Sequence, residues 1–297
     1  HCRVLSELGV LSAVCDKDMH LAEEFGKKYS VNFYNSLETL LEKEEFDAAF
    51  ICTPTITHAD IATKLIESKK HVFVEKPLTY LSEDGQKLVD MANKNNVVLT
   101  CGYIERFNPA VSTVKDFLTS KKYGDLIRLE FYREHRMPQH IKDVGIIYDT
   151  AVHDIDTAMW LFGKTPEVVF AIAGKINHEH EDFATIMLGF KDNKTATISS
   201  NWITPTRVRN FNAVCTDGRI FSDFITQEIR IETDHGTENP KNEKTEPLLL
   251  EIKNFLGAIE TKNDIKVKAE QAVNVTKIAE AALLSSQKGI PIYLDIK

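Results

Sequence analysis

A lysine stands at the end of an apolar run in the stretch Val72-Phe73-Val74-Glu75-Lys76-Pro77. Most lysines lie on the surface, and a surface turn is the simplest interpretation of this one. However, the preceding run is apolar enough to be a buried strand, and proline fixes the backbone that follows. A lysine held in this way can point into a cleft, where its ammonium group can donate a hydrogen bond to a substrate hydroxyl and stabilise a developing alkoxide.

An aspartate and a histidine lie four residues apart, at Asp149 and His153. On a helix this spacing places both side chains on one face, together with Asp156 and Trp160. An Asp one turn from a His can orient the imidazole and raise its basicity, as a general base requires. For an arbitrary pair of this kind, a solvated helix face is the more common outcome. A metal site is a further alternative, but no third ligand has a suitable spacing, so we expect no metal.

Asp16 follows another short apolar run, Leu11 to Cys15. An acid at the end of the second strand of a dinucleotide-binding domain accepts hydrogen bonds from the adenosine ribose hydroxyls and repels a 2′-phosphate. An acid favoured by the positive end of a helix is an equally good interpretation. The glycine-rich loop of such a domain would fall just before His1. We therefore expect this chain to be a fragment without its first strand and phosphate-binding loop.

The elements that would position these residues alternate in the first third of the chain. Near-continuous apolar runs predict buried strands, with capped helices between them. The predicted strands are 11–15, 46–52, 71–74 and 97–100, and the predicted helices are 18–29, one beginning after Ser36, 58–68 and one capped by Ser82 and ending at 94. This pattern indicates a parallel sheet covered on both faces. Asp16, Thr53-Pro54, Glu75-Lys76 and Tyr103 all follow strands, where such sheets bind their ligands.

The pattern changes after about Asn108. A helix at 109–120 leads to longer, alternating runs with turn signals between them, which predict an antiparallel sheet with one face open to solvent or a partner. Its predicted strands are 127–134, 168–176, 183–190, 195–201 and 210–215; segment 233–246 is predicted to be a loop, and helices at 248–261 and 269–288 close the chain. We therefore place two domains, at 1–106 and 107–297, as the length also suggests.

The composition disfavours several classes of function. The chain has 36 basic and 44 acidic residues, a net charge of -8, which argues against a broad nucleic-acid-binding surface. No run approaches the ~20 apolar residues of a membrane span, and no signal-peptide pattern is found. The 5 cysteines are scattered without a C-x-x-C pair, which is typical of free thiols in a reducing compartment. We expect a cytoplasmic protein with no nucleic-acid or membrane partner.

Together these motifs resemble those of the Gfo/Idh/MocA family of nicotinamide-dependent oxidoreductases, along essentially the whole chain. Glu75-Lys76-Pro77 matches the family's E-K-P motif, and Asp149 to Asp154 matches its D-x-x-x-H-D motif. Thr53-Pro54 with His58, and Gly102 to Pro109, look like two further family segments. The resemblance implies an α/β fold with an N-terminal Rossmann domain and a C-terminal α+β domain. The large, mostly antiparallel open sheet of that second domain often joins subunits into homodimers or homotetramers.

The resemblance also implies roles for individual residues. Lys76 would position the substrate and the nicotinamide, His153 would be the general base, and Asp149 would bind or orient at the same centre. The residues expected to bind the cofactor, NAD rather than NADP, are Asp16, Thr53, Pro54, His58, Glu75, Lys76 and Arg106. Those expected to bind substrate are Tyr103, Asn108, Arg136, Tyr148, Trp202 and Arg207. One departure is Glu105, because many members have Asn or Gln before the Arg-Phe pair.

The resemblance limits the substrate to a secondary alcohol on a sugar, polyol or sugar derivative. Segments 104–111, 136–144 (with Arg136 and His140) and 201–209 look most like members that oxidise C3 of UDP-N-acetylglucosamine or its uronate. Arg207 and Arg209 suit a diphosphate, although two arginines can equally guard an edge strand. An inositol or a free sugar is the alternative substrate. An NAD-dependent glycoside hydrolase and a non-catalytic sugar-sensing regulator are the alternative functions.

Overall fold

Short parallel strands and the helices between them form the N-terminal part of the chain. The computed structural model describes residues 1–139, 141–261 and 264–295. In it, β1 (Ala13–Cys15) pairs with β2 (Asn32–Tyr34), and β3 (Ala48–Ile51), β4 (His71–Val74) and β5 (Leu99–Cys101) form a second parallel sheet. Residues 72–74 of β4 are fully buried, as their uninterrupted apolar sequence predicts.

Five helices connect or flank these strands: α1 (Cys2–Glu7), α2 (Met19–Tyr29), α3 (Leu37–Lys43), α4 (His58–Glu67) and α5 (Ser82–Asn95). The predicted caps of α2 and α3 are confirmed, because Asp18 accepts a hydrogen bond from the amide of His20 and Ser36 accepts one from the amide of Thr39. The predicted cap of α5 is wrong. Ser82 lies inside the helix, and both its amide and its hydroxyl bind the carboxylate of Glu280.

The C-terminal part is built on a nine-stranded sheet in the order β13-β12-β11-β10-β6-β9-β8-β7-β14. Its strands are β6 (Leu126–Glu134), β7 (Val168–Gly174), β8 (Phe183–Phe190), β9 (Lys194–Asn201), β10 (Val208–Cys215), β11 (Gly218–Asp223), β12 (Ile229–Thr233), β13 (Gly236–Glu238) and β14 (Ile292–Tyr293). Neighbouring strands are antiparallel except β6 and β9, which are parallel. The prediction of a loop over 233–246 is wrong at its start, where β13 pairs with β12.

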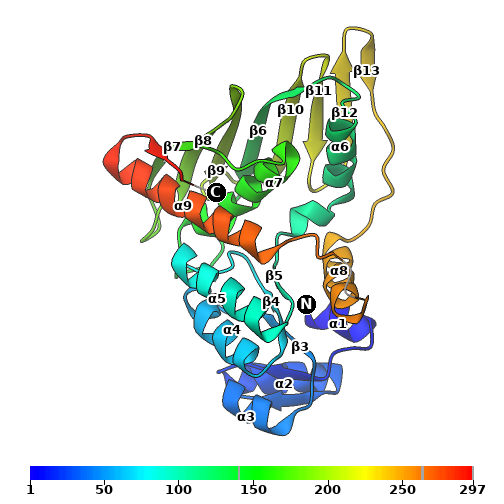
Figure 1. The fold of residues 1–297 in the computed structure, drawn as a ribbon, viewed down its shortest axis with the longest axis vertical. Coiled ribbons are helices and arrows are strands. Elements are labelled where there is room, and N and C mark those ends of the chain that lie inside the picture. Colours follow the sequence, from blue (N-terminus) through cyan, green and yellow to red (C-terminus); the bar gives the residue numbers. More distant parts are fainter. Residues whose placement is uncertain (140, 262–263, 296–297) are drawn as a thin grey trace.

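Helices cover one face of this sheet. Figure 1 shows α6 (Pro109–Thr119), α7 (Val152–Phe162) and α9 (Ala269–Lys288) lying across it. The apolar residues that alternate along the strands point into this layer, so Leu129, Phe131 and Ile186 are buried. Ile172 and Met187 point to the opposite face and are half or more exposed, at 62% and 50%.

The last two helices return to the N-terminal part of the chain. Ile252 on α8 (Pro247–Thr261) packs with Val4 and Leu5 of α1 in a small apolar cluster. The long helix α9 packs against both β7 of the large sheet and α5 of the first domain (Figure 1). The two parts are therefore joined by shared packing as well as by the continuous chain. In the part of the chain that the structure describes, no helix has the length and apolarity to cross a membrane.

Candidate active site

A cavity of about 270 Å³ lies where the carboxyl end of β4 meets the helical face of the large sheet. It is lined by Lys76, Arg133, His135, Pro138, Ile141, Asp149, Thr150, His153 and Arg209. Its volume is close to the lower limit usual for small-molecule sites. The three residues that the sequence places at one catalytic centre, Lys76, Asp149 and His153, therefore line one cavity although more than 70 residues separate the lysine from the others.

The ammonium group of Lys76 is held by Asp149. Its Nζ atom lies 2.8 Å from Oδ1 and 2.5 Å from the main-chain oxygen of Asp149. The two side chains are only 18% and 14% exposed, so solvent screens this pair weakly. Burial alone would raise the pKa of Asp149, but the charge of Lys76 and hydrogen bonds from Lys76 and Thr150 outweigh it and lower that pKa. Asp149 is therefore a carboxylate that fixes the position of the lysine.

The imidazole of His153 is not held by Asp149, contrary to the sequence-based expectation. The buried Nδ1 atom of His153 has no hydrogen-bond partner among the described residues. The segment Ile147–Ala151 forms a π-helical turn before α7, so the aspartate and histidine do not follow ordinary α-helical spacing. The pKa of His153 is well below its usual value because the ring is buried and because Lys76, Arg133 and Arg209 are positive neighbours. The ring is consequently neutral at neutral pH and can accept a proton.

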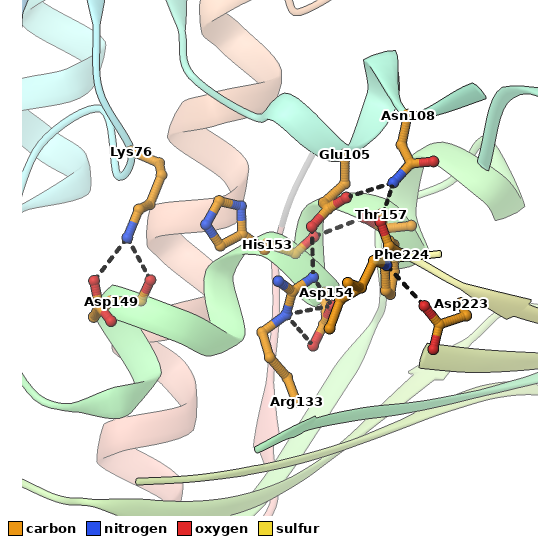
Figure 2. A network of polar contacts seen from close by, with 11 residues as sticks. Lys76, Glu105, Asn108, Arg133, Asp149, His153, Asp154, Thr157, Asp223 and Phe224 are labelled. Atoms are coloured by element: carbon orange, nitrogen blue, oxygen red, sulfur yellow. Dashed lines mark hydrogen bonds and ion pairs between the residues drawn. The ribbon is translucent and has the colours of Figure 1, made fainter. Parts of the chain in front are cut away.

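A buried ionic network lies on the other side of His153 (Figure 2). Arg133 on β6 is 1% exposed and donates hydrogen bonds to Asp154 at 2.9 Å and to Glu105 at 3.1 Å. Asn108 donates to Glu105 in turn. Buried charges need partners of this kind, because a lone one loses its hydration without compensation. The network fixes the helix segment that carries His153 against the sheet.

Three residues of the 103–108 segment, Tyr103, Arg106 and Asn108, are buried and do not line the cavity. Arg106, expected to bind cofactor, directs Nε and one NH2 group to Asp156 and the other to Gln271 and the carbonyl of Lys266. Its guanidinium group is thus occupied within the protein. Its partner Asp156 is not among the residues that line the cavity with Asp149 and His153. Tyr103 and Asn108, expected to bind substrate, are each 1% exposed and lie outside the cavity lining.

The residues expected to bind cofactor at the strand ends fall into two groups. Asp16, Thr53 and Pro54 are exposed after β1 and β3, and Asp16 uses Oδ1 to accept a hydrogen bond from the amide of Asp18. An exposed carboxylate at this edge fits the ribose hydroxyls of a dinucleotide. His58, in contrast, is buried, with its ring nitrogens 2.8 Å and 2.9 Å from the carbonyl oxygens of Pro77 and Thr53.

His58 therefore braces two loops at the sheet edge and is not free to bind a ligand. Glu75, also expected to bind cofactor, lies 2.6 Å from Nε2 of His1 and accepts a hydrogen bond from the amide of Lys76. It lies beside the lysine at the end of β4, on the edge where parallel sheets bind their ligands.

The other residues expected to bind substrate surround the cavity without lining it. Tyr148 is buried and stacks on Tyr80, with ring centroids 5.1 Å apart. Trp202 is buried and donates a hydrogen bond from Nε1 to the hydroxyl of Thr150, so it supports a residue that does line the cavity. Arg136 and Arg207 are exposed on nearby segments, and His140 lies outside the described residues.

Three polar cavity residues, Arg133, His135 and Thr150, have no role in the sequence-based predictions, and Pro138 and Ile141 enter those predictions only within segment 136–144. The sequence does carry a signal for Arg133. It follows Leu129 and Phe131 at alternate, buried positions of β6, where a charged residue is rare. Thr150 carries no such signal. Within the described ranges, no group of three or more His, Cys, Asp or Glu residues could hold a metal ion.

Comparisons with known proteins agree with this architecture. Residues 4–103 match the family described as an oxidoreductase family with an NAD-binding Rossmann fold, and residues 111–221 match the GFO/IDH/MocA C-terminal domain. The UDP-N-acetylglucosamine 3-dehydrogenase of Acidithiobacillus ferrooxidans is 26% identical over 269 residues, which cover 87% of this chain and 84% of that protein. The NAD(+)-dependent scyllo-inositol 2-dehydrogenase of Bacillus subtilis is 27% identical over 296 residues, 93% of this chain and 85% of that protein.

Solved structures show the same fold. That of the Acidithiobacillus ferrooxidans enzyme has a TM-score of 0.89 at 25% identity and covers 97% of this chain and 93% of its own. An oxidoreductase from Agrobacterium radiobacter, solved with NAD+, L-tartaric acid and magnesium, has a TM-score of 0.86 at 17% identity and covers 95% and 90%. The protein belongs to the Gfo/Idh/MocA family of NAD(P)-dependent dehydrogenases acting on CH-OH groups, with an N-terminal Rossmann domain and a C-terminal open-sheet domain.

Proposed function

We propose that the protein oxidises a secondary alcohol of a sugar or sugar nucleotide with NAD, and that C3 of UDP-N-acetylglucosamine or its uronate is the preferred position. One observation carries the proposal: a fixed ammonium group and a neutral imidazole line the same small cavity at the edge of the nucleotide-binding sheet. The sugar-nucleotide preference rests on the relative from Acidithiobacillus ferrooxidans and on the arginines beside the cavity.

Lys76 acts as the hydrogen-bond donor to the carbinol oxygen. An ammonium group has three N–H donors, and Asp149 receives two of them through its side-chain and main-chain oxygens. The third is free to bind the substrate oxygen and to stabilise the negative charge that develops on it. Asp149 thus acts as a positioning residue.

His153 takes the proton of the substrate hydroxyl. Because its pKa is lowered, the imidazole is unprotonated at neutral pH and has a nitrogen available for the proton, although the same shift makes it a weaker base. NAD, when bound, would supply the hydride acceptor: the carbinol carbon loses its hydrogen as hydride while the hydroxyl loses its proton, which leaves a ketone. Asp16 would bind the adenosine ribose and disfavour the 2′-phosphate of NADP, while Thr53, Pro54 and Glu75 would line the remaining cofactor surface.

We also infer two points of organisation. The substrate-binding domain begins near residue 107, where α6 leads into the large sheet. The bare face of that sheet, with Ile172 and Met187, would join two or four copies of the chain, because exposed apolar side chains on a broad sheet favour burial against a like surface.

The proposal is tested by supplying NAD and a panel of UDP-N-acetylglucosamine, its uronate, myo-inositol, scyllo-inositol and D-xylose. NADH absorbance should rise, with the highest kcat/KM for a sugar nucleotide. A preference for an inositol would change the proposed substrate but not the proposed reaction. An inositol is the second candidate substrate because one relative is a scyllo-inositol 2-dehydrogenase. Sugar release without net NADH would indicate a glycoside hydrolase, and tight binding without any turnover would indicate a sugar-sensing regulator. Either result would overturn the proposal.

A further inference from the structure

Arg209 is a half-buried arginine that lines the cavity beside His153. It lies on β10 directly opposite Arg133 of β6 in the antiparallel register. Its Nε atom is buried and has no hydrogen-bond partner in the part of the chain that the structure describes. Burial and the charges of Arg133 and Arg207 lower the pKa of Arg209 to about 10, so it still carries its positive charge at neutral pH.

The carboxylates near Arg209 are already engaged. Asp154 and Glu105 both accept hydrogen bonds from Arg133, and Asp149 holds Lys76. Like charges directly opposite each other across two strands destabilise a sheet. A partly buried guanidinium group without a partner also loses hydration that nothing on the protein replaces. An anion in the cavity would compensate both costs.

An edge-guarding role does not explain Arg209. Charged residues protect sheets from aggregation when they stand on edge strands. Here β10 lies between β11 and β6, and the main-chain oxygen of Arg209 itself accepts a hydrogen bond from the amide of Phe224. The arginine is therefore on an interior strand of the sheet, with its side chain directed to the cavity and not to a free edge.

We propose that Arg209 binds an anionic group of the substrate, so that the enzyme selects acidic sugar derivatives over neutral sugars and polyols. The planar guanidinium group suits a carboxylate or a phosphate, both of which it can bind through two parallel hydrogen bonds. Because Arg209, Lys76 and His153 line one cavity of about 270 Å³, the anion and the reacting alcohol belong to the same small molecule. This inference rests on the proposed function only in assuming that the same molecule presents an alcohol to Lys76 and His153.

The experiment compares one neutral sugar with three sugars that carry a carboxylate, a phosphomonoester or a diphosphate. Dissociation constants of D-glucose, D-glucuronate, D-glucose 6-phosphate and UDP-N-acetylglucosamine are measured by calorimetry in the presence of NAD. The protein is used as wild type, Arg209→Gln and Arg209→Lys. The matched control is Arg230→Gln, which removes one positive charge from β12, where Arg230 pairs with Glu232 outside the cavity. Circular dichroism checks that each variant is folded.

The wild type should bind at least one anionic sugar about tenfold or more tightly than D-glucose, the effect expected of a charge-assisted hydrogen bond. This preference should vanish in Arg209→Gln, survive in part in Arg209→Lys and stay unchanged in Arg230→Gln. The three anionic ligands distinguish a carboxylate from a phosphomonoester or a diphosphate.

Equal affinity for D-glucose and all anionic sugars, no binding of any acidic sugar, or a preference that survives in Arg209→Gln would overturn the inference. NADH formation is recorded in the same samples, because it separates the two proposals. NADH produced equally well from neutral and acidic sugars would contradict the anion site and leave the dehydrogenase proposal intact. Arg209-dependent binding without NADH from any alcohol would support the anion site and contradict the dehydrogenase proposal.

Discussion

The Nζ atom of Lys76 donates hydrogen bonds to both the carboxylate and the main-chain oxygen of Asp149. The lysine comes from the end of a strand in the first domain and the aspartate from the π-helical turn of the second. The contact therefore fixes the ammonium group relative to both domains at once. It also leaves the histidine four residues later free of the aspartate.

Replacing Lys76 by alanine should lower kcat by at least ~10²-fold, because the developing alkoxide would lose the ammonium donor that stabilises its charge. Steady-state NADH formation measures the effect. Lys64→Ala is the matched control, since Lys64 is exposed on α4 and pairs with Glu38. Near-normal turnover of Lys76→Ala would remove the lysine from the mechanism.

Replacing His153 by alanine should also lower kcat at least ~10²-fold, and the wild-type pH profile should identify the group. Because the pKa of His153 is well below its usual value, activity should stay constant as the pH falls through 6.5 and decline only when the ring is protonated at lower pH. Replacing Lys76 by methionine should raise the pKa of His153 by removing one positive neighbour, which NMR titration can measure. An acid limb centred at or above pH 6.5 would contradict the assignment.

Asp16→Ser should shift the cofactor preference toward NADP. The exposed carboxylate after β1 repels a 2′-phosphate, so its removal should lower the NAD-to-NADP ratio of kcat/KM about tenfold or more. Glu24→Gln, which removes an exposed charge from α2, should leave the ratio unchanged. If wild-type protein prefers NADP, the role given to Asp16 is incorrect.

Asp156→Ala should destabilise the fold, because Asp156 pairs with Arg106, which has no role in the proposed reaction. It leaves the buried guanidinium group of Arg106 without its carboxylate, and removing one member of a buried pair costs about 3–5 kcal/mol in the free energy of unfolding. Urea denaturation measures the loss. Glu23→Ala breaks only the exposed pair with Lys27 and should hardly change the urea concentration at the unfolding midpoint. Equal effects of the two variants would show that the Arg106 pair is not structural.

The double variant Ile172→Glu and Met187→Lys should convert the proposed oligomer to monomers, because it places charges on the bare face of the large sheet. Sedimentation velocity measures the mass, and circular dichroism checks the fold. Leu21→Lys changes an exposed apolar residue on α2 and should leave the mass unaltered. A monomeric wild type would show that this face has no copy of the chain against it.

Local patterns in the sequence predict most of the large elements. Segment 183–190 alternates visibly between apolar and small or polar residues, and β8 has the predicted bounds, as does α9. The strands β11 to β13 escaped prediction for different reasons. β12 does alternate, as Ile229-Arg230-Ile231-Glu232, and this signal was overlooked. β13 has only 3 residues, all exposed, so it is held by pairing with β12 rather than by a pattern of its own. The π-helical turn at 147–151 is likewise invisible, because it is a change in backbone hydrogen bonding and not in side-chain type.

The candidate site also has a part that local sequence patterns predict and a part that they do not. The sequence places Lys76, Asp149 and His153 near one centre, but the choice of partners depends on packing between distant segments. Arg133 meets Asp154 and Glu105 across 21 and 28 residues, and Lys76 meets Asp149 across 73. Such contacts follow from the tertiary structure. The pairing of Asp149 with His153 is expected from their spacing alone, but Asp149 instead binds Lys76, which is distant in sequence.

The position of α8 has a consequence for the order of events during synthesis. Domains of larger proteins generally fold one by one as the chain leaves the ribosome, the N-terminal one first. Here Ile252, near the end of the chain, completes the apolar cluster that begins with Val4 and Leu5. This cluster of the N-terminal domain therefore cannot be completed until α8 has emerged, long after the strands and helices of that domain have been made.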